Sequence, residues 1–227
     1  MLSSKGCLYV GIDPRHYKTH LPIYHMPLME IVPRALASRE IQETFRRVLK
    51  FTHIVFTSKS AVRIFFDYFK KSGHTLSELK NTYIIAIGQV PAFYLKEEGV
   101  IPSYVTSDEA QTGVVRVLSA LDLEEVNILL PRSSSMRPQL AHFLVEHDIH
   151  HQICTLYDAH KKRPTVLPDL EMFEEVVFTT PTVIEAFFDL FETIPEELNF
   201  HPIGFYSREA LRKVLHEKRN TDLLQEI

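Results

Sequence analysis

The sequence has 227 residues, of which 45% are hydrophobic and 24% charged, a balance typical of a soluble globular protein with one large or two modest domains. The formal net charge of −4 excludes the overall basic field of a nucleic-acid-binding domain, so no nucleic-acid partner is expected. Only two cysteines are present, Cys7 and Cys154, which indicates a reducing compartment without a disulfide framework. The apolar run at residues 7–12 stops at Asp13 and is too short for a signal peptide or a membrane span. A cytoplasmic protein without membrane attachment is therefore expected.

Several common motifs are missing from the chain. None of the seven glycines forms a GxGxxG or P-loop motif, which disfavours a nucleotide cofactor held by a glycine-rich turn. CxxC, HExxH and GxSxG motifs are absent as well. His150, His151 and Cys154 come closest to a metal cluster, but no further ligand follows at a recognisable spacing. The sequence predicts no metal site.

In chain order, residues 8–12 predict a short strand and residues 13–25 a loop without helical period. The segment 27–33 is bracketed by prolines and is expected to be an extended strand between domains. Residues 34–51 predict a helix, for which Ser38 is a possible N-cap. Its apolar face is expected to contain Ile41, Phe45, Val48 and Leu49.

Strands and helices then alternate, which favours a parallel α/β sheet with right-handed crossovers. Gly73, Gly88 and Gly99 stand where these elements are expected to stop. The predicted strands are 54–57, 83–87, 103–105 and 127–130, and the predicted helices are 58–72, 91–98, 113–121 and 136–146.

Beyond residue 150 the chain extends again. Residues 152–157 are expected to be extended, and 159–168 predict a second linker that mirrors the one at 27–33. After these come a strand at 176–179 with its helix, a strand closed by Ile203-Gly204, a basic helix at 207–219 and a short helical tail. We therefore expect the chain to leave one domain and later return to it.

One stretch occurs twice. Residues 56–69 read FTSKSAVRIFFDYF and residues 178–191 read FTTPTVIEAFFDLF, with six of fourteen positions identical. Each copy follows a β-branched run and is followed by an Ile-Gly pair, at Gly88 and at Gly204. This order predicts a duplicated α/β unit, strand, hydroxyl-rich turn and helix, with a ligand in a cleft between two lobes.

The two turns are candidate ligand sites. A loop at the carboxyl end of a parallel strand faces the crevice above the sheet, and the following helix offers free N–H groups. Together with small hydroxyl side chains, these groups suit a ligand rich in carboxylates. The alternative is that Ser and Thr serve only as N-caps. The hydroxyl residues are Thr57, Ser58 and Ser60 in one turn and Thr179, Thr180 and Thr182 in the other.

FTSKSAV and FTTPTVI resemble the FTS-x-x-x-V turns of the uroporphyrinogen-III synthase family. AIGQVPAFYLKEEGV and PIGFYSREALRKV are similar to its two IG-x-x-TA segments, and ILLPRSSSMRPQLAHFLVEHDI is similar to the segment that returns towards the linker. PLMEIVP and ICTLYDA resemble its two linker strands. The resemblance runs from about residue 27 to residue 204 and beyond, and its specificity lies in the order and spacing of the motifs.

The resemblance implies an α/β fold of two flavodoxin-like three-layer domains with parallel sheets, joined by a two-stranded linker. The discontinuous domain would comprise residues 1–26 and 163–227, the continuous domain 37–151, and the linkers 27–36 and 152–162. It also implies closure of the linear tetrapyrrole hydroxymethylbilane to uroporphyrinogen III, with inversion of ring D and loss of water, in haem biosynthesis. Members of the family use no cofactor, and a monomer is expected.

By the same resemblance Tyr157 is the candidate catalytic residue, as proton donor or as orienting group; the alternative is that this tyrosine only packs. Arg137 is a further possible anchor, although ordinary solvated surface is the favoured interpretation there. The residues expected to bind substrate are Thr57, Ser58, Lys59, Gly88, Arg132, Thr179, Thr180 and Ser207.

The chain departs from the family pattern in three places. Pro91 and Ser207 stand where the family has threonine, residues 11–22 leave no room for the usual helix, and no strand is evident at 219–223. The discontinuous domain is therefore expected to be trimmed. These departures keep open a non-catalytic module that binds a polycarboxylate or another anionic ligand. A nucleotide-sugar transferase is disfavoured by the absence of glycine-rich phosphate loops.

Overall fold

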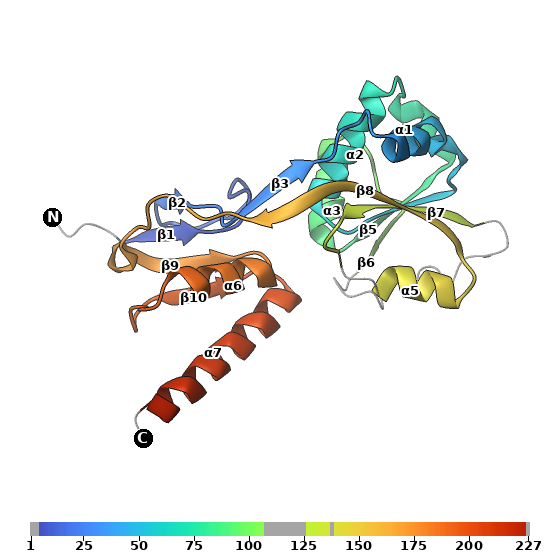
Figure 1. Ribbon diagram of the computed structural model, residues 1–227. Coiled ribbons are helices and arrows are strands. Elements are labelled where there is room, and N and C mark those ends of the chain that lie inside the picture. The colour runs from blue at the N-terminus through green and yellow to red at the C-terminus, as the bar shows by residue number, and fades with distance from the viewer. Residues whose placement is uncertain (1–4, 107–125, 137–138, 226–227) are drawn as a thin grey trace. The chain divides into compact units, whose positions relative to one another are not determined.

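The computed structural model describes residues 5–106, 126–136 and 139–225, with side chains for all of these except 139 and 218–225. The chain forms two compact units (Figure 1). Unit 1 combines Met1–Glu30 with His160–Ile227, and unit 2 is Ile31–Ala159. Of the helices that are described, none has the length and hydropathy needed to span a membrane.

Unit 2 is built on a six-stranded sheet in the order β3-β8-β7-β4-β5-β6 (Figure 1). The pairs from β8 to β6 along this order are parallel. The order reverses between the neighbouring strands β7 and β4, which are far apart in the sequence. The strands are β3 (Met29–Pro33), β4 (His53–Phe56), β5 (Tyr83–Ile87), β6 (Tyr104–Thr106), β7 (Asn127–Ser133) and β8 (His150–Lys161).

Helices cover both faces of this sheet because side chains alternate along each strand. Ile54 and Phe56 pack in one core cluster with residues of α1, α2 and α3. Val55 points the other way and packs with Leu140 and Leu144 of α5. The helices are α1 (Arg39–Arg46), α2 (Lys59–Lys71), α3 (Gln89–Glu97) and α5 (Gln139–Glu146), with 3₁₀ turns at Val48–Lys50 and Leu76–Asn81.

Unit 1 has a four-stranded parallel sheet in the order β10-β9-β1-β2. Two helices pack on the face that contains Leu8, Val176 and Phe178. Apolar residues at helical spacing on both helices, such as Phe187 and Leu211, complete that core. The elements are β1 (Gly6–Tyr9), β2 (Ile23–His25), β9 (Phe173–Phe178), α6 (Pro181–Leu190), β10 (Asn199–Pro202) and α7 (Phe205–Gln225), with a 3₁₀ turn at Leu170–Met172.

The opposite face of this sheet has a different cover. Residues 10–22 connect β1 to β2 and are all described, yet they contain no helix. Tyr17 and Leu21 of this segment pack on Cys7, Tyr9 and Val177 instead. In the part of unit 1 that the structure describes, no strand follows β10. These are the two places at which the sequence predicts a trimmed domain.

The two sheets repeat one arrangement. Counted from β7, the order β8-β7-β4-β5-β6 is the 2-1-3-4-5 order of flavodoxin-like folds. Counted from β1, the order β2-β1-β9-β10 is the same without the fifth strand. The phenylalanine of the repeated FT pair ends β4 in one unit and β9 in the other, and the threonine follows the strand. The predicted class, α/β with two mostly parallel sheets, is confirmed.

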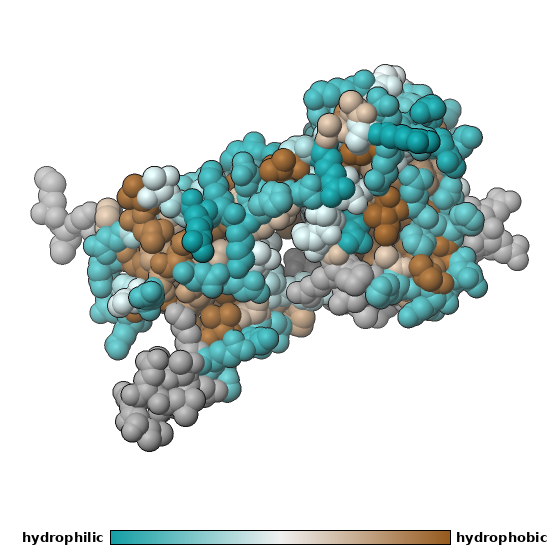
Figure 2. Space-filling model, viewed as in Figure 1, coloured by the Kyte–Doolittle hydropathy of each residue, from teal (hydrophilic) through white to brown (hydrophobic). Residues whose placement is uncertain are grey.

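Some element predictions were wrong. The predicted loop 13–25 ends in β2, whose three residues are all exposed, so no burial period marks this edge strand. Figure 2 shows hydrophobic residues at the surface in this part of unit 1, and Ile23 is 39% exposed. The helix expected at 34–51 is shorter and ends in a 3₁₀ turn, with Leu49 43% exposed. Ser38 occupies the N-cap position without a side-chain cap bond.

Two other elements are longer than predicted. β8 continues to Lys161 through part of the predicted second linker, and α7 begins at Phe205 and runs through the predicted tail. The helix expected at 113–121 lies outside the described residues.

Candidate active site

The carboxyl ends of β4 and β7 form the topological switch point of unit 2. The two strands are neighbours, but the helices that follow them, α2 and α5, lie on opposite faces of the sheet. At such a point the loops diverge and leave a crevice, which is where open α/β sheets bind ligands. Thr57 and Ser58 follow β4, and Arg132 and Ser133 end β7. Four hydroxyl or cationic side chains therefore meet at this edge.

Ser58 connects the turn to a residue from the linker strand. It is the N-cap of α2, in extended conformation, and its Oγ accepts the N–H of Ala61 at 3.1 Å. The same Oγ lies 2.9 Å from Oη of Tyr157 on β8. Oγ can accept the helix N–H and still share a proton with the tyrosine. The structure thus joins two predicted site residues that are 99 positions apart in the sequence.

Tyr157 is 6% exposed, and a shift of register between Arg132 and Ser133 brings Ser133 opposite it. Burial raises the pKa of Tyr157, and hydrogen bonding to the hydroxyls of Ser58, Ser133 and Ser60 offsets part of that rise. A phenol with a raised pKa keeps its proton at neutral pH. The Tyr157 hydroxyl is therefore protonated and lies in a cluster of serine hydroxyls.

Arg132 fixes the loop that follows β7. Its Nε donates to the carbonyl of Ser133 at 3.1 Å, and its Nη2 donates to the carbonyl of Met136. Burial lowers the pKa of this guanidinium, which nevertheless stays charged because arginine does not lose its proton in proteins. Thr57 donates to the sulfur of the same Met136 at 3.6 Å. The loop is thus tied to both strands of the switch point.

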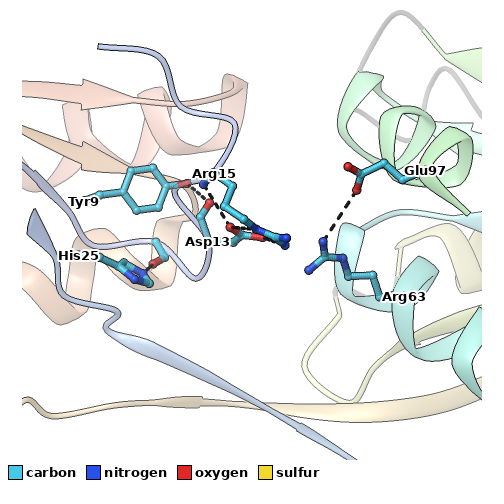
Figure 3. Close-up of polar contacts among 7 residues, drawn as sticks. Tyr9, Asp13, Arg15, His25, Arg63 and Glu97 are labelled. Atoms are coloured by element: carbon cyan, nitrogen blue, oxygen red, sulfur yellow. Dashed lines mark hydrogen bonds and ion pairs between the residues drawn. The ribbon is translucent and has the colours of Figure 1, made fainter. Parts of the chain in front are cut away.

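Lys59 and Gly88 are the other predicted site residues of unit 2, at the start of α2 and directly after β5. Lys59 Nζ is 6.0 Å from the ring centroid of Tyr94, and Arg63 Cζ lies 4.7 Å from the same ring. Arg63 also pairs with Glu97 at 3.8 Å (Figure 3). Gly88 begins α3 with φ of 85°, and its N–H donates to Oγ1 of Thr106 at 3.1 Å. Gly88 therefore supplies a turn, and its N–H is already used within the protein.

In unit 1 the corresponding turn is partly closed. Thr180 is the exposed N-cap of α6, and its Oγ1 accepts the N–H of Val183 at 3.4 Å. Thr179 packs so tightly on Gly11 that a Cβ added to the glycine would lie 2.6 Å from Cγ2 of Thr179. Ser207 is buried, 3% exposed, in the first turn of α7. Of the three residues predicted here, Thr180 is the one classed as exposed to solvent.

Unit 1 contains a polar cluster that the sequence analysis missed, formed by residues of β1, β2 and the segment after β1 (Figure 3). Arg15 Nε and Nη2 donate to the two carboxylate oxygens of Asp13 at 2.9 and 2.7 Å. Tyr9 Oη donates to the carbonyl of Asp13 at 2.9 Å, and His25 Nε2 lies 2.9 Å from the carbonyl of Gly11. The Asp-x-Arg spacing was the only sequence signal for this cluster.

Metal-ligating side chains do not gather in the structure: in the part that is described, no group of three or more His, Cys, Asp or Glu could hold a metal ion. Cys7 and Cys154 are free and buried. Burial raises the pKa of Cys7 to about 12 and that of Cys154 to about 11, so both remain thiols at neutral pH. Arg137, a further predicted anchor, lies outside the described residues.

Known proteins resemble this chain in sequence or in fold. The chain is 25% identical over 227 residues to the porphyrin biosynthesis protein HemD of Ruminiclostridium josui. That match covers 94% of this chain but 42% of the relative, so the chain spans about two fifths of the length of the curated relative.

Two solved structures match the fold at a TM-score of 0.62. One is a mutant uroporphyrinogen III synthase from the extremely thermophilic bacterium Thermus thermophilus, 18% identical, with 92% of this chain and 89% of that chain covered. The other is uroporphyrinogen-III synthetase from Helicobacter pylori, 20% identical, with 92% and 88% covered. The sequence model of the family described as uroporphyrinogen-III synthase HemD matches residues 21–218. This match extends over most of the chain, which therefore belongs to the uroporphyrinogen-III synthase HemD family.

Proposed function

We propose that the protein is a uroporphyrinogen-III synthase, which closes hydroxymethylbilane to uroporphyrinogen III with inversion of ring D and loss of water. The observation that carries this proposal is the hydroxyl pair Ser58–Tyr157, 2.9 Å apart at the switch point of unit 2. Membership of the HemD family supports it, and so does the order of motifs along the chain. The proposal places the protein in tetrapyrrole biosynthesis as a cytoplasmic monomer, without a cofactor.

The reaction requires positioning more than a strong catalyst. The electron-rich pyrrole expels the terminal hydroxyl group, which takes up one proton and departs as water. The substituted carbon of ring D then attacks the resulting methylene carbon and forms a spiro intermediate. One bond of that intermediate breaks, ring D turns over, and the macrocycle closes with loss of a proton. Holding the chain in the attacking geometry is the main task of the protein.

Tyr157 is the proposed proton donor to the departing hydroxyl. Its raised pKa keeps the phenol protonated, and Ser58 orients it. Thr57, Lys59 and the first turn of α2 would receive substrate carboxylates through hydroxyl, ammonium and backbone N–H groups. Arg132 would contribute by holding the loop after β7 in place, and Gly88 by forming the turn into α3. In unit 1 the exposed Thr180 is the proposed carboxylate contact, whereas Thr179 packs on Gly11 and Ser207 is buried.

A coupled assay tests the proposal. Hydroxymethylbilane generated in situ closes spontaneously to the type I isomer, so the oxidised products are separated into type I and type III uroporphyrin. The expected result is type III above the spontaneous background. Type I alone, from protein shown to be folded, would sink the enzymatic proposal and leave a module that binds a polycarboxylate.

A variant pair then tests Tyr157. Tyr157→Phe is expected to slow type III formation about tenfold or more, since general acid assistance contributes roughly 10² or more where a donor is essential. Tyr24→Phe is the matched control, because that tyrosine is 51% exposed on the edge strand β2. Equal rates for the two variants would show that Tyr157 only packs.

A further inference from the structure

We propose that residues 11–15 of unit 1 form a second carboxylate-binding site, in which the guanidinium of Arg15 binds a carboxylate of the substrate. The inference rests on the proposed function for the identity of the ligand, a flexible polycarboxylate. It does not require that the protein catalyses the reaction. The site is made by the trimmed segment between β1 and β2, where the sequence predicted only a loop.

Hydrogen bonds hold the segment around Arg15. Asp13 receives both Nε and Nη2 of Arg15 at 2.9 and 2.7 Å, and its Oδ1 also accepts the backbone N–H of Arg15 at 3.2 Å. Tyr9 and His25, from two paired strands, hold the carbonyls of Asp13 and Gly11 (Figure 3). An exposed arginine normally loses considerable side-chain entropy when it binds an anion. Here much of that loss is already incurred in the unbound protein.

Exposure separates the two charges of the pair. The Asp13 side chain is 11% exposed, whereas the Arg15 side chain is 61% exposed. The carboxylate therefore lies within the turn and orients the guanidinium, and the guanidinium is the part that a ligand meets. Arginine presents a planar set of donors that matches a carboxylate in two-point geometry.

The position in the fold matches the switch point of unit 2. His53 and Glu175 stand three residues before the ends of β4 and β9, and their pairing partners are Ile128 and Cys7. The positions four residues after these partners correspond to each other, and they are Arg132 and Gly11.

Unit 1 thus has glycine where unit 2 has its switch-point arginine. Gly11 contacts Thr179, the residue before the N-cap of α6, so the segment begins beside the positive end of that helix. Arg15 stands four residues further along. In the part of the chain that is described, each switch point therefore has an arginine held by hydrogen bonds, to loop carbonyls in unit 2 and to Asp13 in unit 1.

Binding of uroporphyrin III, a stable octacarboxylate, tests the site by spectroscopic titration of the full chain. Arg15→Ala is expected to weaken binding about tenfold, the scale of one charge-assisted hydrogen bond in a partly solvated place. Arg212→Ala is the matched control: Arg212 also belongs to unit 1, is 78% exposed and pairs with Glu209 at 2.9 Å. Arg212→Ala is expected to change the affinity for the porphyrin by less than about twofold.

A second pair separates orientation from net charge. Asp13→Asn removes a negative charge, which by simple attraction would tighten the binding of a polyanion. If Asp13 orients the guanidinium, the same change weakens binding several-fold, whereas Glu209→Gln leaves it equal or slightly tighter.

The proposal is overturned if Arg15→Ala behaves like Arg212→Ala, if Asp13→Asn binds more tightly, or if the unaltered protein does not bind the porphyrin. A protein that binds through Arg15 but forms only the type I isomer would retain this site and lose the proposed function. If Arg15→Ala forms the type III isomer as fast as the unaltered protein and binds the porphyrin equally well, the proposed function is retained and this site is lost.

Discussion

The two units repeat one order of strands but treat their carboxyl edges differently. At this edge of unit 2, Ser58 and Tyr157 share a hydrogen bond, and Arg132 donates to the carbonyl of Ser133 in the loop after β7. In unit 1 the equivalent of Arg132 is Gly11, packed on Thr179, and the cation stands on the segment after it. The repeat therefore conserves the positions of the two turns, while the side chains that could perform chemistry gather in unit 2.

This contrast follows from how much of each unit surrounds its sheet. In unit 2, α5 leads from β7 into β8, and β8 brings Tyr157 to the edge. In unit 1 residues 10–22 make the corresponding connection without a helix, and β2 has three residues. A short connection places its polar side chains directly at the edge. Each unit therefore has an arginine held by hydrogen bonds, Arg132 at the end of β7 in unit 2 and Arg15 in the connection after β1 in unit 1.

The largest expected difference between the units concerns two equivalent phenylalanines of the repeated segment. Phe66 is fully buried, whereas Phe188 is only partly buried. Phe66→Ala is expected to lower the free energy of unfolding by about 3–5 kcal/mol and Phe188→Ala by about 2 kcal/mol, because water already reaches the second ring. Urea unfolding followed by circular dichroism measures both. Equal losses would mean that the two cores are packed alike.

Gly11 provides the next test, because a side chain there must displace its neighbours. A Cβ would lie 2.6 Å from Cγ2 of Thr179 and 2.9 Å from Cε1 of Tyr9. Gly11→Ala is expected to cost about 2–3 kcal/mol, the scale of overpacking. Gly73→Ala is the control, since no atom of the described residues lies within 4 Å of an added Cβ there, and its φ of 87° opposes the change at about 1 kcal/mol.

The double variant Gly11→Ala with Thr179→Ala identifies the cause. Removing the threonine side chain relieves the closest contact, so the pair should lose less stability than the sum of the single changes. If the losses of stability are strictly additive, the contact between residue 11 and Thr179 is not the cause of the strain.

The two N-caps give a smaller, paired effect. Ser58 and Thr180 each accept a helix N–H, but only Ser58 also bonds Tyr157. Thr180→Ala is expected to cost about 1 kcal/mol through loss of the cap. Ser58→Ala should cost about 2 kcal/mol, because it also deprives a buried phenol of a partner. Thermal unfolding of both variants checks this, and a smaller loss for Ser58→Ala would contradict a structural role for the Ser58–Tyr157 bond.

The sequence predicted most of the fold because local and repeated signals agree. The strand at Tyr83–Ile87 has the predicted bounds, since a buried β-branched run followed by glycine is a local pattern. β2 was missed because its three residues are exposed and it exists only through pairing with β1. The contact between Ser58 and Tyr157 depends on strand order and register, which no local period encodes. Likewise, burial of Ser207 follows from how α7 packs, so its hydroxyl looked available in the sequence.

The smallest expected effect is a pH dependence located in unit 2. His53 is 4% exposed, its Nε2 has no hydrogen-bond partner among the described residues, and its Nδ1 lies 2.8 Å from Oγ1 of Thr52. Burial lowers the pKa of His53, so the folded state favours the neutral ring. The stability from this preference is fully present above the unfolded pKa of about 6.5 and is lost as the pH falls through the folded value.

His53→Leu should therefore reduce the loss of stability between pH 7.5 and pH 5, while His142→Leu, at an exposed position of α5, should leave it unchanged. Urea midpoints measured across that range provide the comparison. The equivalent residue of unit 1 is Glu175, whose carboxylate lies 3.1 Å from Nε2 of His201 and 3.3 Å from the hydroxyl of Tyr17. The buried acid of unit 1 thus lies beside polar partners, whereas Nε2 of His53 has none among the described residues. If His53→Leu keeps the full acid loss, the pH sensitivity has its cause outside His53.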